Sequence, residues 1–179
     1  MKRLFKRLCK EYRCGLTEDG YFSINDGLII KHELLDGVGL DYSKDNNRID
    51  IKEFLKLWND YFKLKEKYPD RVAENKVTVY DVPSDRQEST AGLLNVPVYE
   101  YEDDENKFVF KKAYIDLIEK LIEKNKKKNI NKKIYYFEFK YICRSRYYNT
   151  VDYLNESVAV MVFSDENGQI LAVASGSKE

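Results

Sequence analysis

The sequence predicts an α+β fold in which an N-terminal three-helix segment precedes a mainly antiparallel sheet of about six strands packed against one helix. Three observations predict it. Apolar residues recur at helical spacing up to about residue 68, they alternate with polar residues after residue 75, and short polar turns separate the alternating segments. We therefore expect a helical segment over residues 1–70 and a sheet-and-helix domain over residues 75–179.

Three apolar stripes define the helices expected in the N-terminal segment. The first stripe follows Leu4, Leu8 and Tyr12 at helical spacing. The second helix is expected to begin near residue 25 and to end at Gly37, because glycine commonly follows the last helical turn. The third is expected to run from residue 51 to the break before Pro69, since the residue before a proline avoids helical geometry. The apolar faces of these helices would pack against one another.

The alternating segments after residue 75 are expected to be strands, and one amphipathic stretch among them is expected to be a helix. The strands are predicted over residues 76–82, 96–101, 107–110, 134–143, 157–163 and 169–174. The helix is predicted over residues 111–125. Residues 83–95 are expected to form a loop, and the acidic residues 102–106 are expected to form the turn of a hairpin.

The composition limits the class of partner. The chain has 179 residues with 31 basic and 31 acidic side chains, so its net charge gives no general attraction to a nucleic acid or a membrane. No apolar run approaches the roughly 18 residues of a membrane span, and we expect a cytoplasmic protein without a membrane partner. The abundance of Lys, Asn, Ile and Tyr is typical of low-GC bacteria and their phages and mobile elements.

The stretch DYSKDNNRIDIKEF resembles the calcium-binding loop of an EF-hand, which needs oxygen ligands at positions 1, 3, 5 and 12. Counted from Asp41, the first ligands would be Asp41, Ser43 and Asp45, but position 12 falls on Lys52. Counted back from Glu53, position 1 falls on an aromatic side chain. Neither register supplies the ligand set, so we expect a polar connection here. A calcium-binding module using these four oxygen-bearing residues is a lesser alternative.

Glu138 and Lys140 stand two residues apart in a predicted strand and therefore point to the same face. This spacing resembles that of metal-dependent nucleases of the PD-(D/E)xK type, in which such a pair holds Mg²⁺ and polarises the attacking water. In that family a strand with an acidic residue leads directly into this strand, whereas here the predicted helix 111–125 intervenes. A surface ion pair is the commoner explanation, and a metal-dependent nuclease is the alternative function.

Other catalytic sets are missing from the sequence. His32 is the only histidine, and it has no neighbouring serine or cysteine signature. The three cysteines, Cys9, Cys14 and Cys143, lack the spacing of a zinc site and fit reduced thiols in a reducing compartment. Glycine-rich phosphate loops are also missing. We therefore expect no cofactor and no catalytic residue.

Charged side chains are segregated along the sequence. Lysines concentrate at the end of the predicted helix, arginines and tyrosines follow the next strand, and the acidic turn 102–106 carries the opposite charge. This layout predicts a non-enzymatic binding or inhibitory protein that engages a nucleic acid or a nucleic-acid-binding protein. The residues expected to bind the partner are Lys124, Lys126, Lys127, Lys128, Lys132, Lys133, Arg144, Arg146, Tyr147 and Tyr148.

Overall fold

The computed structural model describes residues 14–16, 21–24, 27–35, 72–144 and 151–179. Within these ranges, ten strands form one antiparallel sheet, and a single α-helix packs on it. The strands are β1 (Cys14–Leu16), β2 (Tyr21–Ile24), β3 (Leu28–Lys31), β4 (Val72–Asp81), β5 (Asp85–Ala91), β6 (Val96–Glu102), β7 (Lys107–Lys111), β8 (Asn131–Arg144), β9 (Val151–Ser164) and β10 (Ile170–Lys178). The helix is α4 (Lys112–Lys124).

The prediction of a three-helix segment followed by six strands is wrong, because the described chain is mostly sheet and its N-terminal part contributes strands β1, β2 and β3. The helix predicted to begin near residue 25 is replaced by β3 and a short 3₁₀ turn, η1 (His32–Leu35). The helices predicted at the N-terminus and over residues 51–68 lie outside the described residues. Among the described residues, no helix has the length and apolar character needed to cross a membrane.

Strand β3 was mistaken for a helix because its apolar residues are continuous. Leu28, Ile29 and Ile30 are at most 3% exposed, since β3 lies between β2 and β10 and is covered on both faces. A strand buried on both faces loses the alternation that marks a half-exposed strand. Over a few residues its pattern is the same as that of a buried helical turn.

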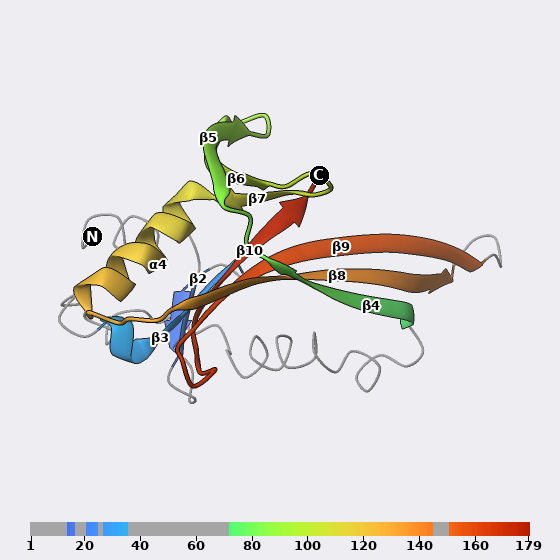
Figure 1. Ribbon diagram of the computed structural model, residues 1–179. Coiled ribbons are helices and arrows are strands. Elements are labelled where there is room, and N and C mark those ends of the chain that lie inside the picture. The colour runs from blue at the N-terminus through green and yellow to red at the C-terminus, as the bar shows by residue number, and fades with distance from the viewer. Residues whose placement is uncertain (1–13, 17–20, 25–26, 36–71, 145–150) are drawn as a thin grey trace.

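Strand β10 lies at the branch point of the sheet, because it pairs with three other strands. One edge of β10 pairs with β9, and the other edge pairs first with β3 and then with β7. Outward from β9 the order continues with β8 and β4, whereas β3 leads to β2 and β1, and β7 leads to β6 and β5. Figure 1 shows β4, β8 and β9 extending together to one side of the molecule, away from α4. Within the described sheet, β1, β4 and β5 each pair with one strand only and are edge strands.

The core lies between α4 and one face of the sheet. The buried side of the helix has spacings of three and four residues, which place it on one stripe: Tyr114, Ile115, Leu117, Ile118 and Leu121. Apolar side chains of β3, β7, β9 and β10 meet this stripe, and the largest of them are Leu28, Ile30, Phe108, Phe110 and Phe163. The opposite face is also apolar and buried at the centre of the sheet, where Val160 and Val173 are at most 3% exposed.

Residues 83–95 do not form a single loop as predicted, because Asp85–Ala91 form β5 at the edge of the sheet. Most side chains of β5 are exposed, and polar residues occupy both of its faces. The sequence therefore lacks the apolar alternation that identifies a strand. The hairpin of β5 and β6 with the adjacent β7 forms a three-stranded unit, which we call the β5–β7 unit.

Candidate functional site

Most of the predicted lysines lie on or just after a turn at the end of α4, which we call the basic turn (residues 124–129). Asn125 caps the helix, and its side-chain amide donates hydrogen bonds to the carbonyl oxygens of Leu121 at 2.8 Å and Leu34 at 2.9 Å. The second bond joins the end of α4 to the 3₁₀ turn η1. The basic turn is therefore attached to two elements of the fold.

The backbone of the basic turn is closed in the pattern of a Schellman motif. The Lys126 N–H donates to the Glu123 carbonyl at 2.9 Å, and the Lys127 N–H donates to the Ile122 carbonyl at 3.1 Å. Lys126 has φ of 52°, the left-handed conformation that glycine usually supplies at this position. A lysine therefore occupies a position where glycine would fit without strain.

Ion pairs with carboxylates of the described residues engage at least three of the six lysines predicted between residues 124 and 133. These pairs are Lys127 with Glu33 at 3.1 Å, Lys132 with Glu119 at 2.9 Å, and Lys133 with Asp81. Lys126 and Lys128 are exposed, and neither is paired with a carboxylate of the described residues. The free positive charge of the basic turn is thus smaller than the sequence predicted.

Of the other predicted basic residues, Arg144 is not brought to the basic turn. Lys132 and Lys133 lie near the start of β8, just after the basic turn, whereas Arg144 ends the strand, roughly 40 Å from Lys132 at about 3.3 Å per residue. The predicted residues Arg146, Tyr147 and Tyr148 lie outside the described part of the chain.

A half-buried carboxylate joins two cations from different strands. Glu119 of α4 accepts hydrogen bonds from Arg86 of β5, whose terminal nitrogen lies 3.1 Å from both carboxylate oxygens, and from Lys132 of β8. Burial alone would raise the pKa of Glu119, but the hydrogen bonds from Lys132 and Arg86 outweigh burial and lower this pKa. Glu119 is therefore ionised at neutral pH and holds the helix to both strands.

An aromatic ring fixes the guanidinium of Arg86. The central carbon of the Arg86 guanidinium lies 4.2 Å from the ring centroid of Tyr99, and the Lys112 nitrogen lies 4.2 Å from the same centroid. The Tyr99 hydroxyl donates to Asp116 at 2.6 Å. Burial, followed by this hydrogen bond, raises the pKa of Tyr99. Cation–π contacts and charged hydrogen bonds thus hold β5, β6 and α4 in one arrangement.

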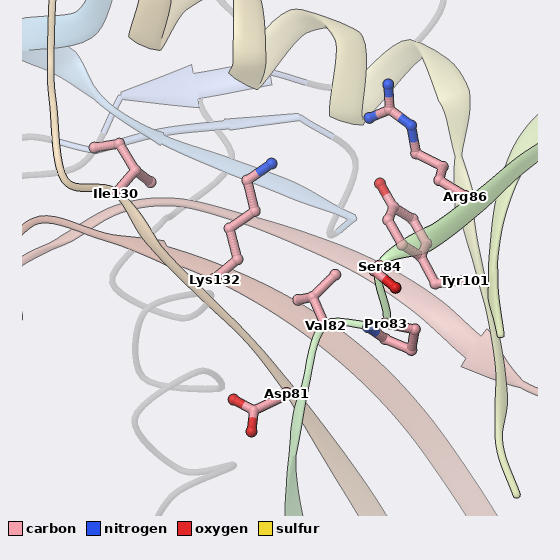
Figure 2. A pocket seen from close by; sticks show the side chains of 8 residues that line it. All are labelled: Asp81, Val82, Pro83, Ser84, Arg86, Tyr101, Ile130 and Lys132. Carbon is pink, nitrogen blue, oxygen red and sulfur yellow. The ribbon is translucent and has the colours of Figure 1, made fainter. Parts of the chain in front are cut away.

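A pocket of about 450 Å³ opens beside this network. Figure 2 shows Arg86, Lys132 and Tyr101 around it, with Val82 and Pro83 of the β4–β5 connection along one wall. Burial raises the pKa of Tyr101, so its hydroxyl remains protonated at neutral pH. The pocket combines two cations, the hydroxyls of Tyr101 and Ser84 and the carboxylate of Asp81 with an apolar wall.

One end of the β5–β7 unit is acidic. Four exposed carboxylates gather there, and none of them forms a salt bridge with a described residue: Asp85, Glu102, Asp104 and Glu105. Asp103 has a structural role, because its carboxylate accepts hydrogen bonds from the backbone of Glu105 and Asn106. We call the four exposed residues the acidic end.

The other end of the β5–β6 hairpin is an apolar turn. Leu93 and Leu94 are 103% and 87% exposed, and they are the most exposed large apolar side chains among the described residues. The turn is closed by a hydrogen bond of 3.1 Å from the Asn95 N–H to the Gly92 carbonyl. We call Leu93 and Leu94 the apolar turn.

Glu138 and Lys140, the pair that resembles a nuclease motif, each stand opposite a residue of opposite charge on β4. Lys76 stands opposite Glu138, and Glu74 stands opposite Lys140 in the pairing of β4 with β8. Lys76 and Glu138 form an exposed ion pair of 3.7 Å. Among the described residues, no three His, Cys, Asp or Glu side chains are grouped to hold a metal ion. The predicted calcium ligands Asp41, Ser43, Asp45 and Glu53 lie outside those residues.

Comparison of the chain with protein families, with curated proteins and with solved structures gives no significant match. The case for function therefore depends on the residues themselves. Sequence reasoning missed Arg86, Tyr101 and Glu119, because they come from three separate elements and share no local motif. A local signal did exist for the apolar turn, since the run Gly-Leu-Leu-Asn places two leucines between turn-forming residues.

Proposed function

We propose that the chain is a non-enzymatic binding or inhibitory protein that engages a nucleic-acid-binding protein through its β5–β7 unit. The observation that carries this proposal is the presence of two exposed leucines and four unpaired carboxylates at opposite ends of the β5–β6 hairpin. Proteins that bind nucleic acids have basic surfaces, and the acidic end is complementary to such a surface.

The apolar turn favours a protein partner over a nucleic acid. Burying a leucine side chain is worth about 1.5–3 kcal/mol, and this gain requires an apolar pocket on the partner. Nucleic-acid interfaces are polar and strongly charged, whereas protein interfaces commonly combine apolar anchors with a polar rim. Leu93 and Leu94 would serve as the anchors and the acidic end as part of the rim.

Direct binding of a nucleic acid through the basic turn is a second candidate. The backbone of Lys126 favours this candidate, because the lysine has a left-handed conformation that glycine would adopt more readily. Residues held in such conformations are concentrated at functional sites. Lys126 and Lys128 would contact phosphate groups from a backbone that the Schellman motif fixes.

The proposal is tested by capture from a nuclease-treated bacterial lysate with four baits. The first is the unchanged chain, and the second has Asp85→Asn, Glu102→Gln, Asp104→Asn and Glu105→Gln at the acidic end. The third has Leu93→Ser and Leu94→Ser, and the fourth has Lys124→Gln, Lys126→Gln and Lys128→Gln. We expect the unchanged chain and the lysine variant to retain a protein that itself binds DNA or RNA. The other two baits should retain at least about 10-fold less of it.

Two results would overturn the proposal. Capture that disappears after nuclease treatment and in the lysine variant would support the second candidate instead. If all four baits captured the same amount of the protein, neither the acidic end nor the apolar turn would belong to the interface. Fluorescence anisotropy with labelled DNA and RNA at low salt measures direct binding independently of the capture.

A further inference from the structure

The charges around the pocket leave one positive charge unbalanced. Arg86 and Lys132 line the pocket and share the single carboxylate of Glu119. Asp81 also lines the pocket, and its charge is balanced by its ion pair with Lys133. Arg86 and Lys132 both contact the same oxygen of Glu119, at 3.1 Å and 2.9 Å, so the two cations are close together. A singly charged anion would neutralise the remaining positive charge of Arg86, Lys132 and Glu119 taken together.

Both cations retain hydrogen-bond donors. A guanidinium has five N–H groups and an ammonium has three. Glu119 engages one terminal nitrogen of Arg86 and one donor of Lys132, and Arg86 also hydrogen-bonds with the Tyr101 side chain. The side chains of Arg86 and Lys132 are each 37% exposed, so solvent molecules or a ligand have access to them. The protonated hydroxyl of Tyr101 adds a further donor at the pocket.

The rest of the pocket suits an apolar body. Val82 and Pro83 line it from the β4–β5 connection, and Ile130 lines it from the segment that precedes β8 (Figure 2). The volume of about 450 Å³ falls within the range of roughly 300–1,000 Å³ that is usual for small-molecule sites. Apolar walls with a few convergent polar groups are typical of such sites.

We propose that this pocket binds a small organic carboxylate, with the carboxylate between Arg86 and Lys132 and the apolar body against Val82, Pro83 and Ile130. A carboxylate carries the single charge that the pocket lacks, and its planar shape matches the fork of a guanidinium. A phosphate monoester carries close to two charges at neutral pH and would exceed the balance. This site adjoins the acidic end, because Asp85 lies between Ser84 and Arg86, but it shares no lining residue with the acidic end or the apolar turn and stands independently of the proposed function.

The experiment is an NMR titration of the ¹⁵N-labelled chain with 2-naphthoate, 2-naphthamide and 2-naphthyl phosphate. The amide has the shape of the carboxylate without its charge. We expect 2-naphthoate to shift the amide signals of residues 82–86 and 130–132 and to bind at least about 10-fold more tightly than 2-naphthamide. Lys132→Gln should weaken 2-naphthoate binding by about 10-fold, and the control Lys76→Gln, at an exposed lysine of β4 outside the pocket, should leave it unchanged.

A second variant separates loss of the site from loss of the fold. Ser84→Trp keeps Arg86, Lys132 and Glu119 and places a bulky ring at the pocket, where it should abolish the signal shifts. Three outcomes would overturn the proposal. They are equal binding of the carboxylate and the amide, 2-naphthoate binding that Lys132→Gln leaves unchanged, and no shift at these residues up to about 10 mM ligand. If 2-naphthyl phosphate bound more tightly than 2-naphthoate, the preferred ligand would be a phosphate monoester, and this would contradict the assignment of a carboxylate.

Discussion

Glu119 on helix α4 and Lys132 on strand β8 form an ion pair of 2.9 Å, and this ion pair attaches the helix to the long β8–β9 hairpin. The Glu119 side chain is 30% exposed, so water screens the pair less than it would a surface pair. Arg86 adds a second cation to the same carboxylate. The stability of the fold is therefore expected to depend on the charge of Glu119.

Glu119→Gln is expected to lower the free energy of unfolding by about 1–2 kcal/mol at neutral pH, because charged hydrogen bonds to Lys132 and Arg86 are weakened. The pKa of Glu119 lies below its ordinary value of 4.5 in the folded chain. Its contribution is therefore complete above pH 4.5 and is lost as the pH falls through the folded-state pKa. Urea unfolding between pH 7 and pH 3 should show the difference from the unchanged chain shrinking in acid. The exposed Glu123→Gln serves as control, and a difference that grows in acid would contradict this explanation.

Lys126→Gly is expected to raise the free energy of unfolding by about 0.5–1 kcal/mol, since glycine adopts a positive φ without strain. Part of the gain is offset by the greater freedom of glycine in the unfolded chain. Lys128→Gly is the matched control. It removes the same charge at a position with negative φ and should not stabilise the chain. Equal effects of the two substitutions in urea unfolding would show that charge, and not backbone conformation, decides the result.

Gly176→Ala is expected to destabilise the junction of β10 with β7 by about 1–3 kcal/mol. A Cβ atom at this position would lie 2.3 Å from the Val109 carbonyl oxygen and 2.6 Å from Cδ1 of Phe110. The backbone of β7 would have to move to admit it. Ser177→Ala, at the neighbouring exposed position, should change the stability by less than about 0.5 kcal/mol. A midpoint of thermal unfolding that is the same for both variants would disprove the close approach.

Leu93→Ser combined with Leu94→Ser is expected to change the free energy of unfolding by less than about 0.5 kcal/mol, because neither side chain is buried in the chain. The same variant should be more soluble, since two exposed apolar side chains are removed. Urea unfolding and solubility measurements check these two effects. A loss of more than about 1 kcal/mol would mean that the leucines support the fold and are not anchors for a partner.

Plasmid and single-stranded DNA incubated with Mg²⁺ or Mn²⁺ are expected to remain intact, because Glu138 is engaged with Lys76 on the adjacent strand. Glu138→Ala should behave like the unchanged chain in the same assay. Cleavage by the unchanged chain that disappears in Glu138→Ala would establish the nuclease alternative.

The sequence predicted elements with strong local patterns and failed where tertiary contacts decide the conformation. The helix α4 and strands β6, β7, β8, β9 and β10 all lie where periodicity and turn residues placed them, apart from shifts at their ends. Strand β3 was missed because Leu28, Ile29 and Ile30 are buried on both faces. Strand β5 was missed because Arg86 and its polar neighbours show no alternation.

The candidate site was predictable only in part for the same reason. Local density of charge revealed the basic turn and the acidic residues after β6. It did not reveal that Lys132 pairs with Glu119, or that Lys133 pairs with Asp81, because these partners are distant in sequence. The contact of Arg86 with the Tyr99 ring likewise arises only when β5 and β6 pair beside α4.

The most direct test of the proposed function measures the dissociation constant of the captured protein for the chain at several salt concentrations. We predict that affinity falls steeply with salt for the unchanged chain and for the lysine variant, and that the acidic-end variant binds more weakly with a shallower dependence. The variant with Leu93→Ser and Leu94→Ser should bind more weakly at every salt concentration while retaining the full salt dependence. Equal affinity of all the variants, or a salt dependence that only the lysine substitutions remove, would contradict a protein interface built on the β5–β7 unit.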